Sequence, residues 1–392
     1  MGALAGLSRR YRYNPLMSED ATQALLGGLT PATFLRRHWQ KRPLLARRAI
    51  PGFHGMLLPS DLFALAGRDD VESRIVVRER GRWSVLQGPF RASALKRLPS
   101  RGWTLLVHGV NLHVAAADAL LRCFAFIPYA RLDDLMVSHA VPGGGVGPHF
   151  DSYDVFLLQG PGRRRWRVGR QRDLALRRGV PLKILARFAP TFAYTLASGD
   201  MLYLPPEYAH DGIALDECST YSIGFRAPSA QELGTAFLDW MRDRLSLEGR
   251  YADPGLAATR EPARIDRSMH AQCRKMIRSV RWEAELVERF VGSYLTEPKP
   301  HVFFDRPRHP LSLREFGLAA ARRGVRLDPR SQILYDERHV YVNGTALDWP
   351  ARRVQALKRL ANSRRLGGAD VNGVGWVLLL YRWYCDGYLG FD

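Results

Sequence analysis

The middle of this chain is a series of short strand patterns separated by turn residues, and this series limits the folds it can adopt. Seven runs are rich in β-branched, aromatic and leucine side chains and are bounded by glycine, proline or aspartate. They cover residues 104–107, 134–138, 154–159, 165–168, 193–196, 201–204 and 220–225. Strands at this spacing favour a β-barrel or a sandwich over alternating βαβ units. We also expect Gly160-Pro161-Gly162 to join two of the runs as a hairpin.

The segments before and after these strands show mainly helical sequence patterns. Helices over 31–40 and 60–66 and a hairpin of 74–77 with 83–86 are predicted before the barrel, and helices within 229–247 and 265–294 after it. In the basic tail that follows, the sequence predicts a helix over 312–323, a hairpin near Asn343-Gly344 and a helix over 350–361, and the chain closes with an apolar segment. The predicted domains are therefore an N-terminal α/β extension (1–100), the barrel (101–228), a helical region (229–298) and a C-terminal α/β domain (299–392).

The composition is that of a globular protein with more than one domain. The chain has 392 residues, 46% of them hydrophobic and 24% charged, and this length is too great for one ordinary core. No apolar run approaches the roughly 20 residues that a membrane span needs, so we expect no membrane partner. The first ten residues lack the pattern of a signal peptide, and the four cysteines are scattered without a CxxC pair. These features predict a cytoplasmic protein with reduced thiols.

The charge of the chain is strongly positive. A formal net charge of +20 and a sequence pI near 10.3 favour anionic partners, with nucleic acid or ribosomes first among them. The frequent arginine pairs fit equally well with a lineage that uses arginine freely. Charge alone leaves both interpretations open.

Three residues within the barrel region suggest a metal site. His149 and Asp151 are two positions apart, so in extended backbone both side chains project to the same face. His210 follows a strand pattern and two prolines. Two imidazoles and one carboxylate can occupy one face of an iron(II) ion and leave open positions for a co-substrate and O2. The glycine-rich run 143–147 before His149 permits a close approach to this site, and it matches neither phosphate-binding glycine motif.

A cation for a co-substrate carboxylate stands nearby in the sequence. The run from Arg163 to Arg167 contains four arginines and one tryptophan. Strand alternation places Arg164 and Trp166 on one face and the other arginines on the opposite, solvated face. A guanidinium group binds a carboxylate with two parallel hydrogen bonds. We therefore predict that Arg164 binds the distal carboxylate of 2-oxoglutarate.

Several segments resemble a known family. Residues 141–149, residues 154–160 followed by Arg163-Arg164-Arg165-Trp166, residues 222–228 and the N-terminal run 34–45 are similar to the bacterial ribosomal oxygenases. Members of that family are JmjC-type, 2-oxoglutarate-dependent hydroxylases of an arginine in a large-subunit ribosomal protein. The resemblance covers most of residues 31–228.

The resemblance implies both a fold and an activity. The fold is mixed α and β: a double-stranded β-helix barrel of the jelly-roll, JmjC and cupin type, then a helical region that forms a homodimer, then a winged-helix-like domain. His149, Asp151 and His210 are the implied Fe(II) ligands, Arg164 the co-substrate anchor, and Ser138 a residue that lines the co-substrate or substrate pocket. The reaction consumes 2-oxoglutarate and O2, releases succinate and CO2, and hydroxylates the protein substrate.

Substrate contacts and the basic tail give two further expectations. A guanidinium substrate needs acidic neighbours, for which Asp133, Asp134, Asp154 and Asp211 are candidates, although surface or turn roles are an alternative for each. The tail is expected to bind ribosomal RNA weakly, or else to serve only for packing or substrate docking.

Other functions remain open. They are a JmjC-type demethylase, a hydroxylase of another side chain such as histidine, a cupin enzyme with another metal, and a non-catalytic nucleic-acid-binding regulator.

Overall fold

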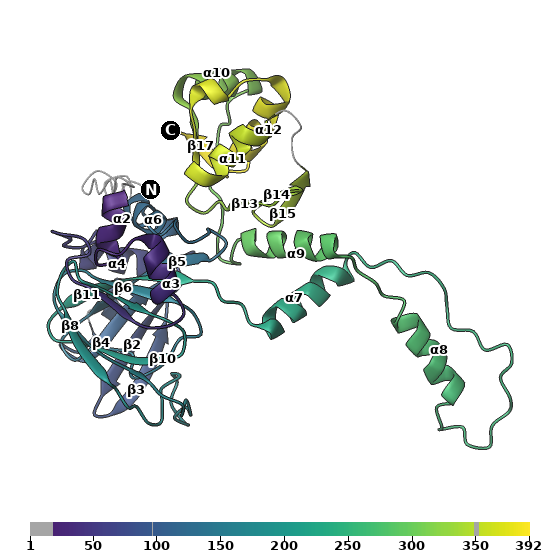
Figure 1. The fold of residues 1–392 in the computed structure, drawn as a ribbon, viewed down its shortest axis with the longest axis horizontal. Coiled ribbons are helices and arrows are strands. Elements are labelled where there is room, and N and C mark those ends of the chain that lie inside the picture. The colour runs from purple at the N-terminus through teal and green to yellow at the C-terminus, as the bar shows by residue number, and fades with distance from the viewer. Residues whose placement is uncertain (1–18, 96, 349–352) are drawn as a thin grey trace. The chain divides into compact units, whose positions relative to one another are not determined.

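The computed structural model describes residues 19–95, 97–348 and 353–392 (Figure 1). They fall into two units. The first unit contains the residues up to Ala227 together with Lys299–Ser331 and Arg364–Asp392, and the second contains Pro228–Pro298 and Gln332–Ser363. Among these described residues no helix is long and apolar enough to span a membrane.

Two antiparallel sheets form the barrel of the first unit. The larger sheet has the strand order β1-β9-β6-β11-β5-β4-β2-β3 and the smaller one the order β10-β7-β8. The strands are β1 (Leu44–Ala46), β2 (Ser73–Glu79), β3 (Arg82–Gln87), β4 (Trp103–Val107), β5 (Leu132–Ala140), β6 (Val155–Gln159), β7 (Arg164–Arg170), β8 (Phe192–Leu196), β9 (Met201–Leu204), β10 (Tyr208–Ala214) and β11 (Cys218–Phe225). The seven predicted strands are all present.

Alternation along β6 shows how the sheets pack. Val155 and Leu157 belong to a buried cluster with Trp166 and Val168 of β7, in the smaller sheet. Their neighbours Phe156 and Leu158 face the opposite way, into the largest core of the protein. Since successive side chains on a strand point to opposite faces, β6 is buried on both sides. The result is the expected jelly-roll barrel.

Short helices cover the outer face of the larger sheet. They are α2 (Glu19–Leu25), α3 (Pro31–Arg37), α4 (Pro59–Ala66), α5 (Ala92–Leu95) and α6 (Ala115–Arg122), with a 3-10 turn at Val110–Leu112. Helix α3 begins as predicted, because the Thr30 side chain accepts a hydrogen bond from the Thr33 amide. Its buried Phe34 lies with its ring centroid 4.9 Å from that of Tyr203 in a T-shaped pair. Such pairs contribute about 1 kcal/mol beyond simple burial, and this one fixes α3 on β9.

Three features of the barrel differ from the sequence-based expectation. Gly160-Pro161-Gly162 is not a hairpin turn, because β6 pairs with β9 and β11 whereas β7 pairs with β8 and β10. The chain therefore crosses from one sheet to the other at this point. Strand β10 was not predicted as a strand, since its centre contains Asp211 and Gly212, two residue types that are rare in strands. Helix α6, between β4 and β5, was also not predicted.

The C-terminal segments of the first unit form a small α/β layer. Its elements are α10 (Leu313–Arg323), β12 (Val325–Leu327), β16 (Arg365–Leu366), a 3-10 turn at Gly368–Asp370, α12 (Val374–Cys385) and β17 (Leu389–Phe391). The strand order is β16-β12-β17. The buried Phe316 of α10 lies 5.1 Å from the ring of Tyr384 in α12. The apolar closing segment thus packs on the predicted helix, α10.

The second unit contains helices and a three-stranded meander. Its elements are α7 (Ala230–Arg242), α8 (Arg267–Ile277), α9 (Ala284–Thr296), β13 (Ile333–Tyr335), β14 (His339–Val342), β15 (Thr345–Asp348) and α11 (Val354–Ser363). The region 265–294 is thus two helices. Asn343-Gly344 is the turn between β14 and β15. The predicted helix over 350–361 begins in residues that lie outside the described part. The first ten residues, where no signal peptide was predicted, also lie outside it.

Candidate metal centre

Main-chain pairing places the two histidines of the predicted triad side by side. His149 follows the glycine-rich run, whereas His210 lies in β10. The His149 amide donates to the His210 carbonyl at 2.9 Å, and the His210 amide donates to the His149 carbonyl at 2.7 Å. Residues paired in this way project their side chains to the same face of a sheet. Their imidazole centroids are accordingly 4.2 Å apart.

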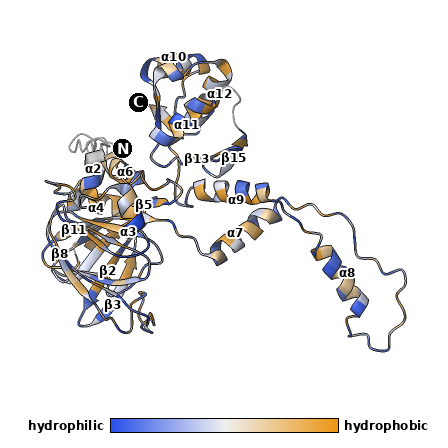
Figure 2. Cartoon of the chain, in the orientation of Figure 1, coloured by the Kyte–Doolittle hydropathy of each residue, from blue (hydrophilic) through white to orange (hydrophobic). Residues whose placement is uncertain are grey.

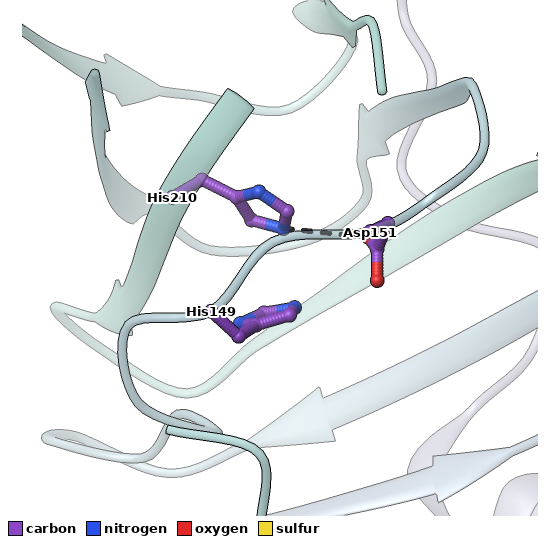
Figure 3. Close-up of side chains that lie close together, drawn as sticks. All are labelled: His149, Asp151 and His210. Atoms are coloured by element: carbon purple, nitrogen blue, oxygen red, sulfur yellow. Dashed lines mark ion pairs between the residues drawn. The ribbon is translucent and has the colours of Figure 1, made fainter. Parts of the chain in front are cut away.

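Asp151 completes the group. One ligand atom from each of His149, Asp151 and His210 lies within 4.8 Å of the other two (Figure 3). The distance from His210 Nε2 to Asp151 Oδ2 is 3.6 Å. The structure therefore brings together all three residues that the sequence singled out, with His210 inside its own strand rather than at the end of a preceding one.

The hydrogen bonds of both imidazoles orient them as metal donors. His149 Nδ1 lies 2.9 Å from the Gly147 carbonyl oxygen, and His210 Nδ1 lies 2.9 Å from the Tyr208 carbonyl oxygen. A carbonyl oxygen can only accept, so each Nδ1 carries the proton and each Nε2 presents its lone pair. Burial, together with the neighbouring His149, lowers the pKa of His210 to about 4. His210 is thus neutral, as a metal ligand must be, at any pH near 7.

The glycine-rich run makes close backbone contacts with two strands. A Cβ on Gly145 would lie 2.5 Å from the Gly212 carbonyl oxygen of β10, and one on Gly144 would lie 2.2 Å from the Trp103 carbonyl oxygen of β4. Only glycine fits at such distances. This close approach holds the segment before His149 against β10 and β4.

Arg164 is a buried cation with unsatisfied hydrogen-bonding groups. Arg164 is 4% exposed, and its Nε and Nη2 atoms have no hydrogen-bond partner among the described residues. It shares a strand face with Trp166, whose ring centroid lies 5.9 Å from that of His210. Buried polar groups are nearly always paired, and an unpaired guanidinium is costly. The two free donors suit an anionic ligand held beside the triad.

Two further unpaired polar atoms on the buried strands were not singled out by sequence reasoning. Trp166 Nε1 and Thr104 Oγ1 are buried and lack a partner among the described residues. The sequence analysis placed Trp166 on the same strand face as Arg164 but assigned it no role. Thr104 offers no such signal, because a threonine in an apolar strand usually only packs. Together with Arg164 these atoms give the barrel the kind of donor set that a dicarboxylate requires.

Ser138 lies on β5 and is buried. Ala140, two positions further on the same strand, packs against Ala214 of β10. Alternate residues share a face, so Ser138 faces the interior of the barrel. Its contact with a co-substrate or substrate stays a prediction.

The four candidate acidic residues are all engaged with other parts of the chain. Asp154 is fully buried and accepts hydrogen bonds from Tyr203 and Gln40. Asp211 forms an ion pair with Arg167 at 2.5 Å. Asp133 pairs with Lys299 at 3.1 Å, and Asp134 accepts from the Gly109 amide. Each of the four therefore has a partner within the described part of the chain, and a role for any of them in binding a substrate stays a prediction.

Two family models match the chain. The first, the JmjC domain, covers residues 119–233, and the second, a ROXA-like winged helix, covers residues 279–390. The winged-helix-like part expected at the C-terminus is thereby confirmed.

Relatives and solved structures agree with these matches. The ribosomal protein uL16 3-hydroxylase of Escherichia coli is 37% identical over 336 residues, 84% of this chain and 88% of the relative. A probable ribosomal oxygenase of Haemophilus influenzae is 37% identical over 52% of each chain. The crystal structure of Escherichia coli YcfD superposes with a TM-score of 0.82 at 34% identity, over 93% of this chain and 98% of that one. A structure of the same ribosomal oxygenase in complex with cobalt and 2-oxoglutarate superposes with a TM-score of 0.79.

Proposed function

We propose that this chain, which belongs to the ribosomal oxygenase family of JmjC proteins, hydroxylates a side chain of a large-subunit ribosomal protein with Fe(II) and 2-oxoglutarate. The observation that carries the proposal is the triad of His149, Asp151 and His210 in the same barrel as a buried Arg164 with two unpaired donors. This combination supports oxygen-dependent chemistry with a dicarboxylate co-substrate. It gives no support to a non-catalytic regulator.

Each residue of the site has a distinct role in this proposal. His149 and His210 would bind Fe(II) through Nε2, and Asp151 through a carboxylate oxygen that also offsets part of the charge of the cation. The bound iron supplies the activation of O2. Arg164 holds the distal carboxylate of 2-oxoglutarate and thereby fixes its orientation, and the buried faces of Trp166 and Ser138 exclude water from it.

The side chain that is modified is proposed to be an arginine of uL16. The name of the Escherichia coli relative refers to uL16 and to hydroxylation, and this supports uL16 as the substrate. We place the activity in the cytoplasm, where ribosomes assemble.

One observation favours a second candidate substrate, a histidine. A guanidinium group requires carboxylate or carbonyl acceptors, and the four predicted aspartates are already paired. A neutral imidazole needs no such carboxylate.

Mass spectrometry of ribosomal proteins separates these candidates. Cells that lack this chain should contain a large-subunit protein lighter by the mass of one oxygen atom, and fragmentation should locate the change on an arginine. Expression of the wild-type chain should restore the oxygen atom, and expression of an Asp151→Ala variant should not. A histidine as the modified residue would favour the second candidate, and an unchanged set of ribosomal proteins would contradict both.

We also propose that the second unit mediates homodimerisation. Helices α7 and α8 alternate hydrophobic and hydrophilic residues (Figure 2), and two of their apolar side chains are largely exposed, Leu238 at 63% and Ile277 at 72%. Large apolar side chains that stay exposed among the described residues would be buried if these helices packed against a second copy of the chain. We expect Leu238→Glu with Ile277→Glu to shift the sedimentation of the chain from dimer to monomer. The equally exposed Leu318, in α10, is a matched control, and its change to Glu should leave the dimer intact.

A further inference from the structure

A strongly basic surface lies on the barrel near the metal centre. It comprises the tip of the β2–β3 hairpin and the loop between β7 and β8. Its nine arginine or lysine side chains are all exposed: Arg78, Arg80, Arg82, Arg170, Arg172, Arg177, Arg178, Lys183 and Arg187. The same two segments contain only Glu79 and Asp173 as acidic residues. Within the described part of the chain none of the nine forms an ion pair, in contrast to Arg163 and Arg167 beside them. We call this group the basic surface.

A pocket lies between the two segments of the basic surface. It has a volume of about 300 Å³, within the size range of small-ligand sites. Two aromatic rings of its wall each lie beneath a guanidinium group, and the wall also contains Asp211, which is paired with Arg167. Arg78 lies over the ring of Trp83 at 5.3 Å, and Arg167 lies over the ring of Phe188 at 5.5 Å. Arg177 lines the same pocket.

The loop that carries most of this charge is held to the barrel by backbone contacts. The Leu185 amide donates to the Pro148 carbonyl at 2.8 Å, and within the loop the Arg177 amide donates to the Ile184 carbonyl at 2.7 Å. Ile184 and Leu185 are buried. The exposed cations therefore lie on a loop whose backbone is hydrogen-bonded to Pro148, the residue before His149. A surface of this kind is preorganised, which lowers the entropic cost of binding.

We propose that the basic surface binds single-stranded RNA. Guanidinium groups hold phosphates with paired hydrogen bonds. Unpaired bases stack on aromatic rings and on the planes of arginine side chains. An acidic peptide has no bases to stack, so these rings favour RNA over such a peptide. The inference goes beyond the proposed hydroxylation. If that function holds, bound ribosomal RNA also removes the repulsion between a basic enzyme and a basic ribosomal protein.

The test is RNA binding by the full chain without co-substrate. The probe is a fluorescent oligouridine of about twelve nucleotides, a length that such grooves accommodate. We expect Arg78→Gln with Arg177→Gln and Arg178→Gln to weaken binding at low salt by at least about 10-fold. The plot of log affinity against log salt should become shallower by about 2, because three phosphate contacts of about 0.7 each are lost. Trp83→Leu should weaken binding by about 5-fold or more with the slope unchanged, because stacking carries no charge.

A matched triple variant tests the location of the surface. Arg314, Arg322 and Arg326 are exposed, and their change to Gln removes the same charge from the C-terminal part. We expect this control to bind RNA like the wild type. Equal losses in the two triple variants, no loss in Trp83→Leu, or equal affinity for a polyglutamate probe would overturn the proposal. Turnover of 2-oxoglutarate by the same proteins is measured in parallel, so a failure of RNA binding is distinguishable from a failure of the proposed enzymatic function.

Discussion

Replacement of Asp151 by alanine is expected to reduce 2-oxoglutarate turnover by at least about 10³-fold, which corresponds to about 4 kcal/mol of lost transition-state stabilisation. The two imidazoles that remain donate their Nδ1 protons to backbone carbonyls, and an imidazole that binds a metal contributes no negative charge. The variant therefore loses the only anionic donor of the triad, and with it the group that compensates the charge of the cation. The measurement is succinate release, with the metal content of the purified protein determined alongside.

A surface aspartate provides the control for this experiment. Asp216 forms an ion pair with Arg163 at 2.9 Å, outside the triad. Its replacement by alanine removes the same charge and should leave turnover near the wild-type value. Succinate release at the wild-type rate from Asp151→Ala would contradict the metal-site assignment.

Replacement of Arg164 by methionine is expected to have opposite effects on co-substrate binding and on stability. We expect the KM for 2-oxoglutarate to rise by about 100-fold, as for the loss of one partner of a buried charge pair. The chain without co-substrate should become more stable by about 1–3 kcal/mol, because the variant no longer buries a guanidinium with two unpaired nitrogens. Thermal unfolding of both proteins with and without 2-oxoglutarate measures the second effect.

The pattern of melting temperatures distinguishes this role from a structural one. Saturating 2-oxoglutarate should raise the melting temperature of the wild type by mass action and leave that of Arg164→Met unchanged. Arg165, on the exposed face of the same strand, serves as the control, and its change to Met should preserve the response. If Arg164→Met lowered the stability of the co-substrate-free chain and still responded to 2-oxoglutarate, Arg164 would be a structural residue.

The barrel was predictable because its strands are recognisable one at a time. Runs such as 154–159 and 201–204 are apolar and short, and these properties depend on local sequence. The pairing of the strands is different, because it depends on which faces are buried together. For this reason the Gly160-Pro161-Gly162 turn was wrongly interpreted as a hairpin, and β10, whose sequence alternates weakly, was overlooked although it carries His210.

The site was predictable to the extent that its chemistry uses rare residue combinations. A His-x-Asp pair, a second histidine and an arginine on the inner face of a strand are visible in the sequence. The partners of the aspartates are not visible in the sequence. Asp154 contacts Tyr203, and Asp211 contacts Arg167, only in the folded sheets. The role of Ser138 and the boundaries between the four predicted domains stay predictions.

The paired main chains of His149 and His210 have a consequence for metal exchange. Two amide–carbonyl hydrogen bonds set the spacing of the imidazoles, so the ion itself does not have to assemble them. In small zinc domains, by contrast, metal affinity and folding free energy are the same quantity. If the triad binds a metal as proposed, we expect metal affinity and folding free energy to be separable in this chain, so that competing divalent ions could occupy the site without unfolding it. Mis-metallation would thus silence the protein while leaving its architecture, and any partner bound elsewhere on it, undisturbed.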